Sequence, residues 1–284
     1  MIDLNLDEVK QIIKTHNYRR VLVLLPAGLM PMADKLEIPE PTFFATPCYG
    51  ACDVPLHLIN QFDAIFNFGH SNPGGYPENV HFFETQVRVE TPKFIPPFDK
   101  VGLVYIIQYK DMVEKYAKVL RKSGKEVIIG GKPDFMATHN GQVTGCDTGA
   151  AKSILDKVEG FVVAADGMFH AGAVAALGKQ TFNWNGEKAS PPKYPMAALF
   201  MAKRIGILIG TKPGQSFIKE AEEVRNRLER QGKQVLTVLG DTITLDIKNL
   251  PVDFWIVAAC PRLAEDEHLT PAAPVKEVLS TIHG

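Results

Sequence analysis

Short apolar runs recur along the chain, and stretches with helical periodicity separate them. Residues 101–107 form one such run, and from 111 to 122 apolar residues recur at helical spacing with lysines between them. Ser123 and Gly124 follow, where glycine suits the left-handed residue beyond a helix end. The next run covers 126–129. The pattern predicts a strand, a helix and a second strand, in that order.

The same order recurs in the last third of the chain. An apolar run at 205–209 precedes Ser216, which suits the N-cap of a helix, and a further run follows at 234–238. Weaker counterparts in the first third are a run at 20–25, a short helix at 32–36 and a run at 42–45. We therefore expect one supersecondary unit to occur three times.

Each third also contains another apolar run, at 64–68, 161–165 and 254–259. Runs without alternation that helices separate are typical of parallel strands covered on both faces. This pattern predicts an α/β fold of three similar Rossmann-like units, covering residues 1–97, 98–195 and 196–284 and arranged around a central site. Proline pairs at 96–97 and 191–192 suit the boundaries. The alternative is one or two ordinary doubly wound domains, which have the same strands without the symmetry.

Charge and hydropathy exclude several classes of protein. Lys and Arg total 31 against 32 for Asp and Glu, so we expect no basic surface for nucleic acid or for an anionic membrane. No apolar run approaches the ~20 residues of a membrane-spanning helix. The first residues are acidic and lack the apolar core of a secretory signal, which predicts a cytoplasmic protein.

Four cysteines, Cys48, Cys52, Cys146 and Cys260, are the main candidates for chemistry. In a reducing compartment they are buried thiols, metal ligands or nucleophiles rather than disulfides. Cys52 and Cys146 occupy matching loops after the second strand of their units, and an aspartate follows each. Cys260 ends a strand and precedes Pro261, which suits the first position of a helix. Parallel sheets bind ligands beyond the carboxyl ends of their strands, where all three of these cysteines fall.

Three thiolates drawn from three units could meet only at a central junction. On an iron–sulfur cubane they would leave one iron open for a substrate. Tetrahedral zinc with His70 or His170 as a fourth ligand is an alternative, and buried spectator thiols are another. The spacing alone does not choose among them. Cys48 is expected to be a spectator near the site.

Loops after other strands supply further candidates. Gly69, His70 and Ser71 follow the third strand of the first unit, and Phe169 and His170 follow that of the second. Glycine allows the backbone to approach a ligand, and histidine can contact it. The loop from Gly210 and Thr211 to Gln215 lacks the glycine spacing of nucleoside triphosphate and dinucleotide loops, which leaves another nucleoside-like ligand open. Arg262 could bind a substrate carboxylate through two parallel hydrogen bonds.

Four passages together resemble the diphthamide synthase family, the 2-(3-amino-3-carboxypropyl)histidine synthases of archaea and eukaryotes. They read YGACD (49–53), FGHS (68–71), GQVTGC (141–146) and AACPRL (258–263). The resemblance implies a [4Fe-4S] cluster on Cys52, Cys146 and Cys260, with S-adenosylmethionine (SAM) bound to the open iron. Family members are non-conventional radical SAM enzymes that release methylthioadenosine and a 3-amino-3-carboxypropyl radical. This radical adds to a histidine of translation elongation factor 2, the first step of diphthamide biosynthesis.

The same resemblance implies roles for individual residues. Arg262 would hold the substrate carboxylate. The nucleoside pocket would be lined by Gly69, His70, Ser71, Phe169, His170, Gly210, Thr211 and Gln215. A homodimer and an external electron donor are also implied.

The chain departs from the family at several places. Residues 72–75 read Asn-Pro-Gly-Gly where the family often has Cys-Leu, and 108–109 read Gln-Tyr where it often has Gln-His. Loops near a site control access of the acceptor. One alternative therefore keeps the SAM chemistry but has another protein or a small molecule as acceptor. Another is a non-catalytic scaffold whose thiols hold a structural metal.

Overall fold

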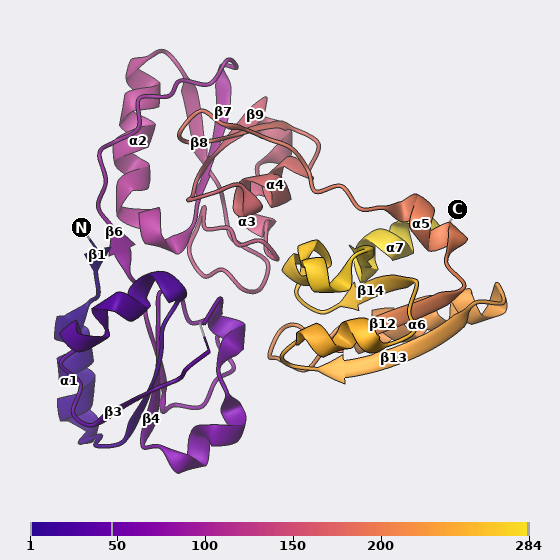
Figure 1. Cartoon of the computed structure of the whole chain (residues 1–284). Coiled ribbons are helices and arrows are strands. Elements are labelled where there is room, and N and C mark those ends of the chain that lie inside the picture. Colours follow the sequence, from indigo (N-terminus) through magenta and orange to yellow (C-terminus); the bar gives the residue numbers. More distant parts are fainter. Residues whose placement is uncertain (1, 47, 283–284) are drawn as a thin grey trace. The chain divides into compact units, whose positions relative to one another are not determined.

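The computed structural model describes residues 2–46 and 48–282. The chain divides between Pro192 and Lys193 into two compact bodies, each of which is described by itself. The first body contains two main sheets, one parallel and one parallel except for a single edge strand, together with a short antiparallel pair; the second body contains one parallel sheet (Figure 1). Each of these sheets takes all its strands from one of the three ranges expected from the sequence.

The first sheet has four parallel strands in the order β3-β2-β4-β5. Its strands are β2 (Val21–Leu24), β3 (Pro41–Phe43), β4 (Ala64–Phe68) and β5 (Val80–Phe83). The accompanying helices are α1 (Leu6–His16) and the 3₁₀ helices η1 (Ala27–Lys35), η2 (Ala51–Asp53) and η3 (Leu56–Gln61). Every residue of β2 and β4 is buried, as their apolar sequences predict, and the one polar residue among them, Asn67, is buried as well.

The second sheet of the first body has five strands in the order β11-β10-β9-β7-β8. Its strands are β7 (Lys100–Tyr105), β8 (Glu126–Ile129), β9 (Gly160–Ala164), β10 (Gln180–Asn183) and the antiparallel β11 (Lys188–Ala189). The helices of this part are η4 (Ile107–Tyr109), α2 (Lys110–Lys122), α3 (Gly149–Lys152), η5 (Leu155–Lys157) and α4 (Phe169–Ala175). A short antiparallel pair joins β1 (Ile2–Asp3) to β6 (Gln86–Val87).

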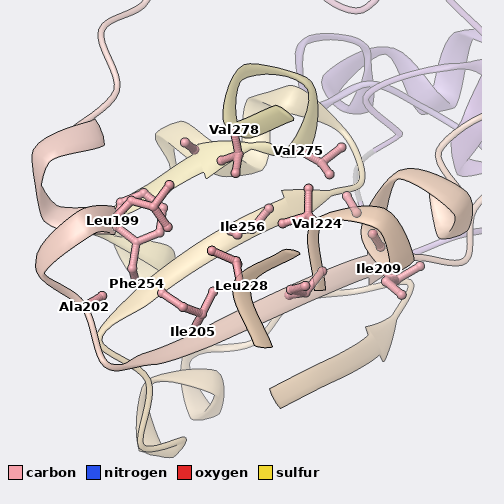
Figure 2. Close-up of a cluster of buried hydrophobic side chains, with 14 residues drawn as sticks. Leu199, Ala202, Ile205, Ile209, Val224, Leu228, Phe254, Ile256, Val275 and Val278 are labelled. Carbon is pink, nitrogen blue, oxygen red and sulfur yellow. The ribbon is translucent and has the colours of Figure 1, made fainter. Parts of the chain in front are cut away.

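The second body has one parallel sheet in the order β13-β12-β14-β15. Its strands are β12 (Arg204–Gly210), β13 (Gln234–Gly240), β14 (Phe254–Ala258) and β15 (Ala272–Pro274). Its helices are α5 (Met196–Met201), α6 (Ile218–Arg230), η6 (Leu245–Asn249), η7 (Pro261–Glu265), η8 (Glu267–Leu269) and α7 (Val275–Ile282). Figure 2 shows Ile256 of the sheet near Val224 of α6 and Val278 of α7, and Ile205 near Leu228 of α6, within one buried cluster. Each such side chain stabilises the fold by about 1.5–3 kcal/mol relative to an exposed position.

Local signals are confirmed in part. Gly124 has φ +87°, as expected for a residue that ends a helix. The N-cap expected at Ser216 is wrong: α6 begins one residue later, with Phe217 at the N-cap and no side-chain cap. The short helix expected at 32–36 lies within a 3₁₀ helix, where Pro31 removes a backbone donor. Within the described ranges, no helix combines the length and apolarity needed to cross a membrane.

Candidate functional site

The loop that carries Cys52 follows β3 and is folded by the next residue, Asp53. The Asp53 carboxylate accepts hydrogen bonds from the backbone N–H groups of Tyr49 (2.6 Å) and Gly50 (3.0 Å). A β-carbon on Gly50 would lie 3.0 Å from Cys52 Sγ, so glycine lets the sulfur lie against the backbone. The loop thus holds a half-buried Cys52 at the carboxyl edge of the first sheet.

Cys48 is different, because only 2% of it is exposed. Its Sγ donates to Gly50 O (3.2 Å) and accepts from Asn67 Nδ2 (3.4 Å). Burial raises the pKa of this thiol to about 12, so it is protonated at neutral pH. These contacts support the expectation that Cys48 is a spectator.

The loop that carries Cys146 is organised by Asp147, which is 1% exposed. Its carboxylate accepts five backbone N–H bonds of 2.8–3.1 Å, from residues 134–137 and 149. Burial alone would raise the pKa of Asp147, but these hydrogen bonds outweigh it and the pKa lies below its usual value. Cys146 itself is exposed, with Sγ 3.3 Å from Thr144 Oγ1. The Cys-Asp pair therefore works alike in the first two units: the aspartate folds the loop that presents the cysteine.

Phe169 and His170 lie at the start of α4, beside the Cys146 loop. A β-carbon on Gly145 would overlap the ring of Phe169, so this ring packs directly on the backbone next to Cys146. The Nδ1 atom of His170 is buried and has no hydrogen-bond partner within the described residues. Burial lowers the pKa of His170 to about 4, which keeps the ring neutral. A neutral ring with an open nitrogen is suited to a hydrogen bond with a nucleoside.

His70 follows Gly69, whose φ of +83° requires glycine at this turn. Its Nδ1 lies 2.8 Å from Asn67 Oδ1. Burial lowers the pKa of His70 to about 4, although hydrogen bonds with the backbone of Tyr49 oppose this shift. His70 is therefore neutral and tied to the loop of Cys52. Ser71 is 4% exposed, and its hydroxyl is used inside the protein, where it accepts from Gln142 Nε2 (3.0 Å).

In the second body, β14 ends at Ala258, so Cys260 follows the strand after Ala259 rather than ending it; Pro261 begins η7, as the sequence predicts. A β-carbon on Gly210, at the end of β12, would lie 2.9 Å from the β-carbon of Ala259. The two strand ends therefore approach closely beside Cys260. The guanidinium of Arg262 is 58% exposed and lies 2.9 Å from Glu265 Oε2. Thr211 N donates to Gly240 O (3.2 Å), and Gln215 N donates to Lys212 O (3.0 Å).

The structure brings the predicted residues together in two groups. In the first body, His70 lies beside the backbone of Tyr49, in the loop that carries Cys52. The ring of Phe169 packs on Gly145, the residue before Cys146. The second body joins Cys260 to the loop at Gly210. Over residues 2–46 and 48–282, no three His, Cys, Asp or Glu side chains are grouped as a metal site. The convergence of the three cysteines depends on how the two bodies meet, and it stays a prediction.

Two residues of the site carried no predicted role. Gln142 is 2% exposed and contacts Ser71, and Gln108 Nε2 donates to Gly69 O (2.8 Å). A buried amide is recognisable only by its partners, which lie far away in the sequence. The local signals were the position of Gln142 within the GQVTGC passage and that of Gln108 in the pair that the family often has as Gln-His.

Comparison with known proteins defines the class. The model of the family described as "Putative diphthamide synthesis protein" matches residues 30–191 and 192–275, so the chain belongs to this family. The 2-(3-amino-3-carboxypropyl)histidine synthase of Pyrococcus horikoshii is 26% identical, over 92% of this chain and 84% of that protein. Subunit 1 of the Bos taurus synthase is 23% identical over 87% of this chain, which spans 64% of the bovine protein. The crystal structure of Dph2 from Pyrococcus horikoshii with a 4Fe-4S cluster has a TM-score of 0.84 at 22% identity, covering 100% of this chain and 92% of that one. This likeness confirms the predicted α/β fold.

Proposed function

We propose that this chain transfers the 3-amino-3-carboxypropyl group of SAM to a histidine of translation elongation factor 2 in the cytoplasm. In this reaction one-electron reduction breaks the sulfonium bond toward the methionine γ-carbon, methylthioadenosine leaves, and the resulting radical adds to the imidazole C2 atom. The adduct then loses the C2 proton to a base and one electron to a one-electron acceptor, which restores the aromatic imidazole. One observation carries the proposal. In a member of the diphthamide synthesis family, each of the three main parallel sheets has a cysteine at the carboxyl side of its strands, in the order Cys52, Cys146 and Cys260. The names of the relatives support the same reaction.

The three cysteines fit an iron–sulfur cluster by the chemistry of their donor atoms. Thiolates are the usual ligands of [4Fe-4S] clusters, and Cys52, Cys146 and Cys260 would hold such a cluster. When bound, the cluster supplies one-electron reduction and an open iron position for SAM, with the electron coming from an external donor. The carboxylates of Asp53 and Asp147 accept hydrogen bonds from nearby backbone N–H groups, so protein groups themselves fold the first two ligand loops.

The remaining predicted residues fit a SAM site. The open Nδ1 atom of His170 can accept from or donate to the nucleoside, and the Phe169 ring offers an apolar face beside Cys146. Gly210 and Gly69 keep β-carbons away from crowded loop ends. Arg262 would bind the carboxylate of SAM, in exchange for its exposed contact with Glu265. We propose these roles together with those of His70, Ser71, Thr211 and Gln215, in a homodimer.

The experiment uses anaerobically purified protein after cluster reconstitution. We expect a brown protein that releases methylthioadenosine from SAM after dithionite reduction, and label transfer from SAM to the matching elongation factor 2. Release of deoxyadenosine, or a colourless protein after reconstitution, contradicts the proposal. Bound zinc without SAM binding would instead support a non-catalytic scaffold.

A second candidate keeps the SAM chemistry but changes the acceptor. It is favoured by the side chain of Tyr109, which donates to Asp166 Oδ1 (2.5 Å) at a position where the family often has histidine. Methylthioadenosine release without label on elongation factor 2 would favour this candidate.

A further inference from the structure

The carboxyl end of β7 is extended by a distant loop. Tyr105 N donates to Gly141 O (2.9 Å), and Val143 N donates to Tyr105 O (2.8 Å). These two bonds place Gln142 in a parallel bridge with Tyr105. Gln142 lies four residues before Cys146, so the start of the cysteine loop is fixed to the second sheet by backbone hydrogen bonds.

The side chain of Gln142 uses both ends of its amide. Its Oε1 accepts from the backbone N–H groups of Thr138 (2.9 Å) and His139 (3.0 Å). Its Nε2 donates to Ser71 Oγ (3.0 Å), on the turn that follows β4 of the first sheet. A buried amide that is hydrogen-bonded at both ends is a rigid connection, because breaking either end leaves a polar group without a partner.

Gln108 makes the second connection to the same turn. It follows β7 by three residues, and its Nε2 donates to Gly69 O (2.8 Å). Both amides thus lie at the carboxyl end of β7, Gln108 just after the strand and Gln142 in the loop that is bridged to Tyr105. They donate hydrogen bonds to the residues on either side of His70, Gly69 and Ser71.

A cluster of charged and polar side chains, Glu84, Lys110 and His139, lies near Ser71. Glu84 lies 2.5 Å from His139 Nε2 and 3.5 Å from Lys110 Nζ. Burial would raise the pKa of Glu84, but hydrogen bonds from His139 and Ser71 outweigh it and keep the carboxylate ionised. The hydroxyl of Ser71 therefore lies near the amide of Gln142 and the carboxylate of Glu84.

We propose that Gln108 and Gln142 are positioning residues that hold the Gly69–Ser71 turn against the second sheet and so shape the SAM site. The inference rests on the proposed function, because that function gives the turn its ligand. Neither amide needs to touch SAM or the cluster. Their effect passes through the main-chain position of His70 and through the start of the Cys146 loop.

The test compares Gln108→Met and Gln142→Met with the control Asn79→Leu. Asn79 is also a part-buried amide that donates to a backbone carbonyl, Asp63 O at 3.2 Å, but it lies at the opposite end of the first sheet. The loss of a buried hydrogen bond predicts a rise of about tenfold in the KM for SAM, with kcat and iron content within about twofold of the wild-type protein. The control leaves all three quantities unchanged.

Hydrogen–deuterium exchange of the segment 67–72 gives a readout that does not need turnover. Gly69 N donates to Phe83 O (2.8 Å), and we expect this segment to exchange faster in both glutamine variants but not in Asn79→Leu. Gln142→Met also removes the acceptor for two backbone amides. If Gln142→Met does not fold, Gln108→Met alone decides the result.

The outcomes separate this inference from the proposed function. If the wild-type protein releases no methylthioadenosine, the proposed function is refuted. The exchange rates of segment 67–72 in the variants still test whether Gln108 and Gln142 hold the turn in place. An active wild-type protein whose variants keep both the KM and the exchange rate overturns the positioning alone. A fall in kcat at constant KM, or equal effects in Asn79→Leu, overturns it as well.

Discussion

The ring of Phe169 packs directly on the backbone of Gly145, so closely that a β-carbon at Gly145 would overlap the ring atom Cε1. Gly145 is the residue before Cys146, and Phe169 begins α4 after β9. The contact therefore joins a proposed ligand loop to a proposed wall of the nucleoside site. Only glycine permits it.

This contact predicts the effect of Gly145→Ala. The added methyl group forces the Phe169 ring or the Cys146 loop to move, at a cost of about 1–3 kcal/mol in folding free energy. We expect SAM affinity to fall at least about tenfold, because about 1.4 kcal/mol of strain at the binding site corresponds to a tenfold change in the dissociation constant. Titration calorimetry with SAM and thermal unfolding measure the two effects.

The control for this change is Gly28→Ala. A β-carbon on Gly28, in η1, would meet nothing within 4 Å, so this change adds the same methyl group without a clash. This variant should keep both the melting temperature and the affinity for SAM. Normal SAM affinity in Gly145→Ala would show that the Phe169 contact does not matter for the site.

The five backbone hydrogen bonds to Asp147 predict a large loss of stability in Asp147→Asn. The amide cannot accept on its nitrogen side, which leaves buried N–H groups without a partner and costs at least about 2 kcal/mol at pH 7. Denaturant unfolding of the two proteins measures the difference. Asp99→Asn is the control, because the side chain of Asp99 is 84% exposed and its pair with Lys125 contributes little.

The same variant has a defined pH dependence. The pKa of Asp147 in the folded protein lies below the ~3.9 of an unfolded aspartate, so its stabilisation is present above that pH and is lost as the pH falls below it. The difference between wild-type protein and Asp147→Asn should therefore shrink at pH 3. A constant difference from pH 7 to pH 3 would contradict this assignment.

The strands that could be predicted from the sequence are those buried on both faces. Central strands such as β9 and β14 read as unbroken apolar runs because neither face meets water, and β4 does so except for the buried Asn67. The edge strands β5 and β15 were not predicted, because they are short and include histidine or proline. Their pairing comes from the neighbouring strand rather than from their own pattern.

The site shows the same limit. The positions of the cysteines after strands were predictable, because strand ends can be located from the sequence. The bond between Gln142 and Ser71 was not, since it joins residues of two different sheets. The meeting of Cys260 with the other two cysteines stays a prediction, because it lies in the other compact body.

Cys48 and Cys52 should respond differently to removal of sulfur. Cys48 is buried, protonated and hydrogen-bonded to Gly50 and Asn67, so Cys48→Ala should keep the full iron content and cost about 1 kcal/mol of stability. Cys52→Ala should lose most of its iron, because a proposed ligand is gone. Iron per chain and visible absorption after anaerobic reconstitution measure the contrast. Equal loss of iron in both variants would make Cys48 a ligand.

Two buried histidines predict that the metal-free protein loses stability in mild acid. Burial lowers the pKa of His70 and of His170 to about 4 in the folded protein, whereas unfolded histidine titrates near ~6.5. Between these values the unfolded chain binds more protons, so the free energy of unfolding falls as the pH drops from about 6.5 to about 4. Denaturant unfolding at pH 7, 6 and 5 measures this slope.

The variant His70→Gln should flatten that slope, because one of the two buried imidazoles no longer titrates. His57→Gln is the matched control, since His57 is exposed, and it should keep the wild-type slope. If His70→Gln and wild-type protein lose stability equally between pH 7 and pH 5, His70 is protonated in the folded state. A positively charged His70 would then repel the sulfonium of SAM, and the neutral turn between Gly69 and Ser71 would no longer suit that ligand.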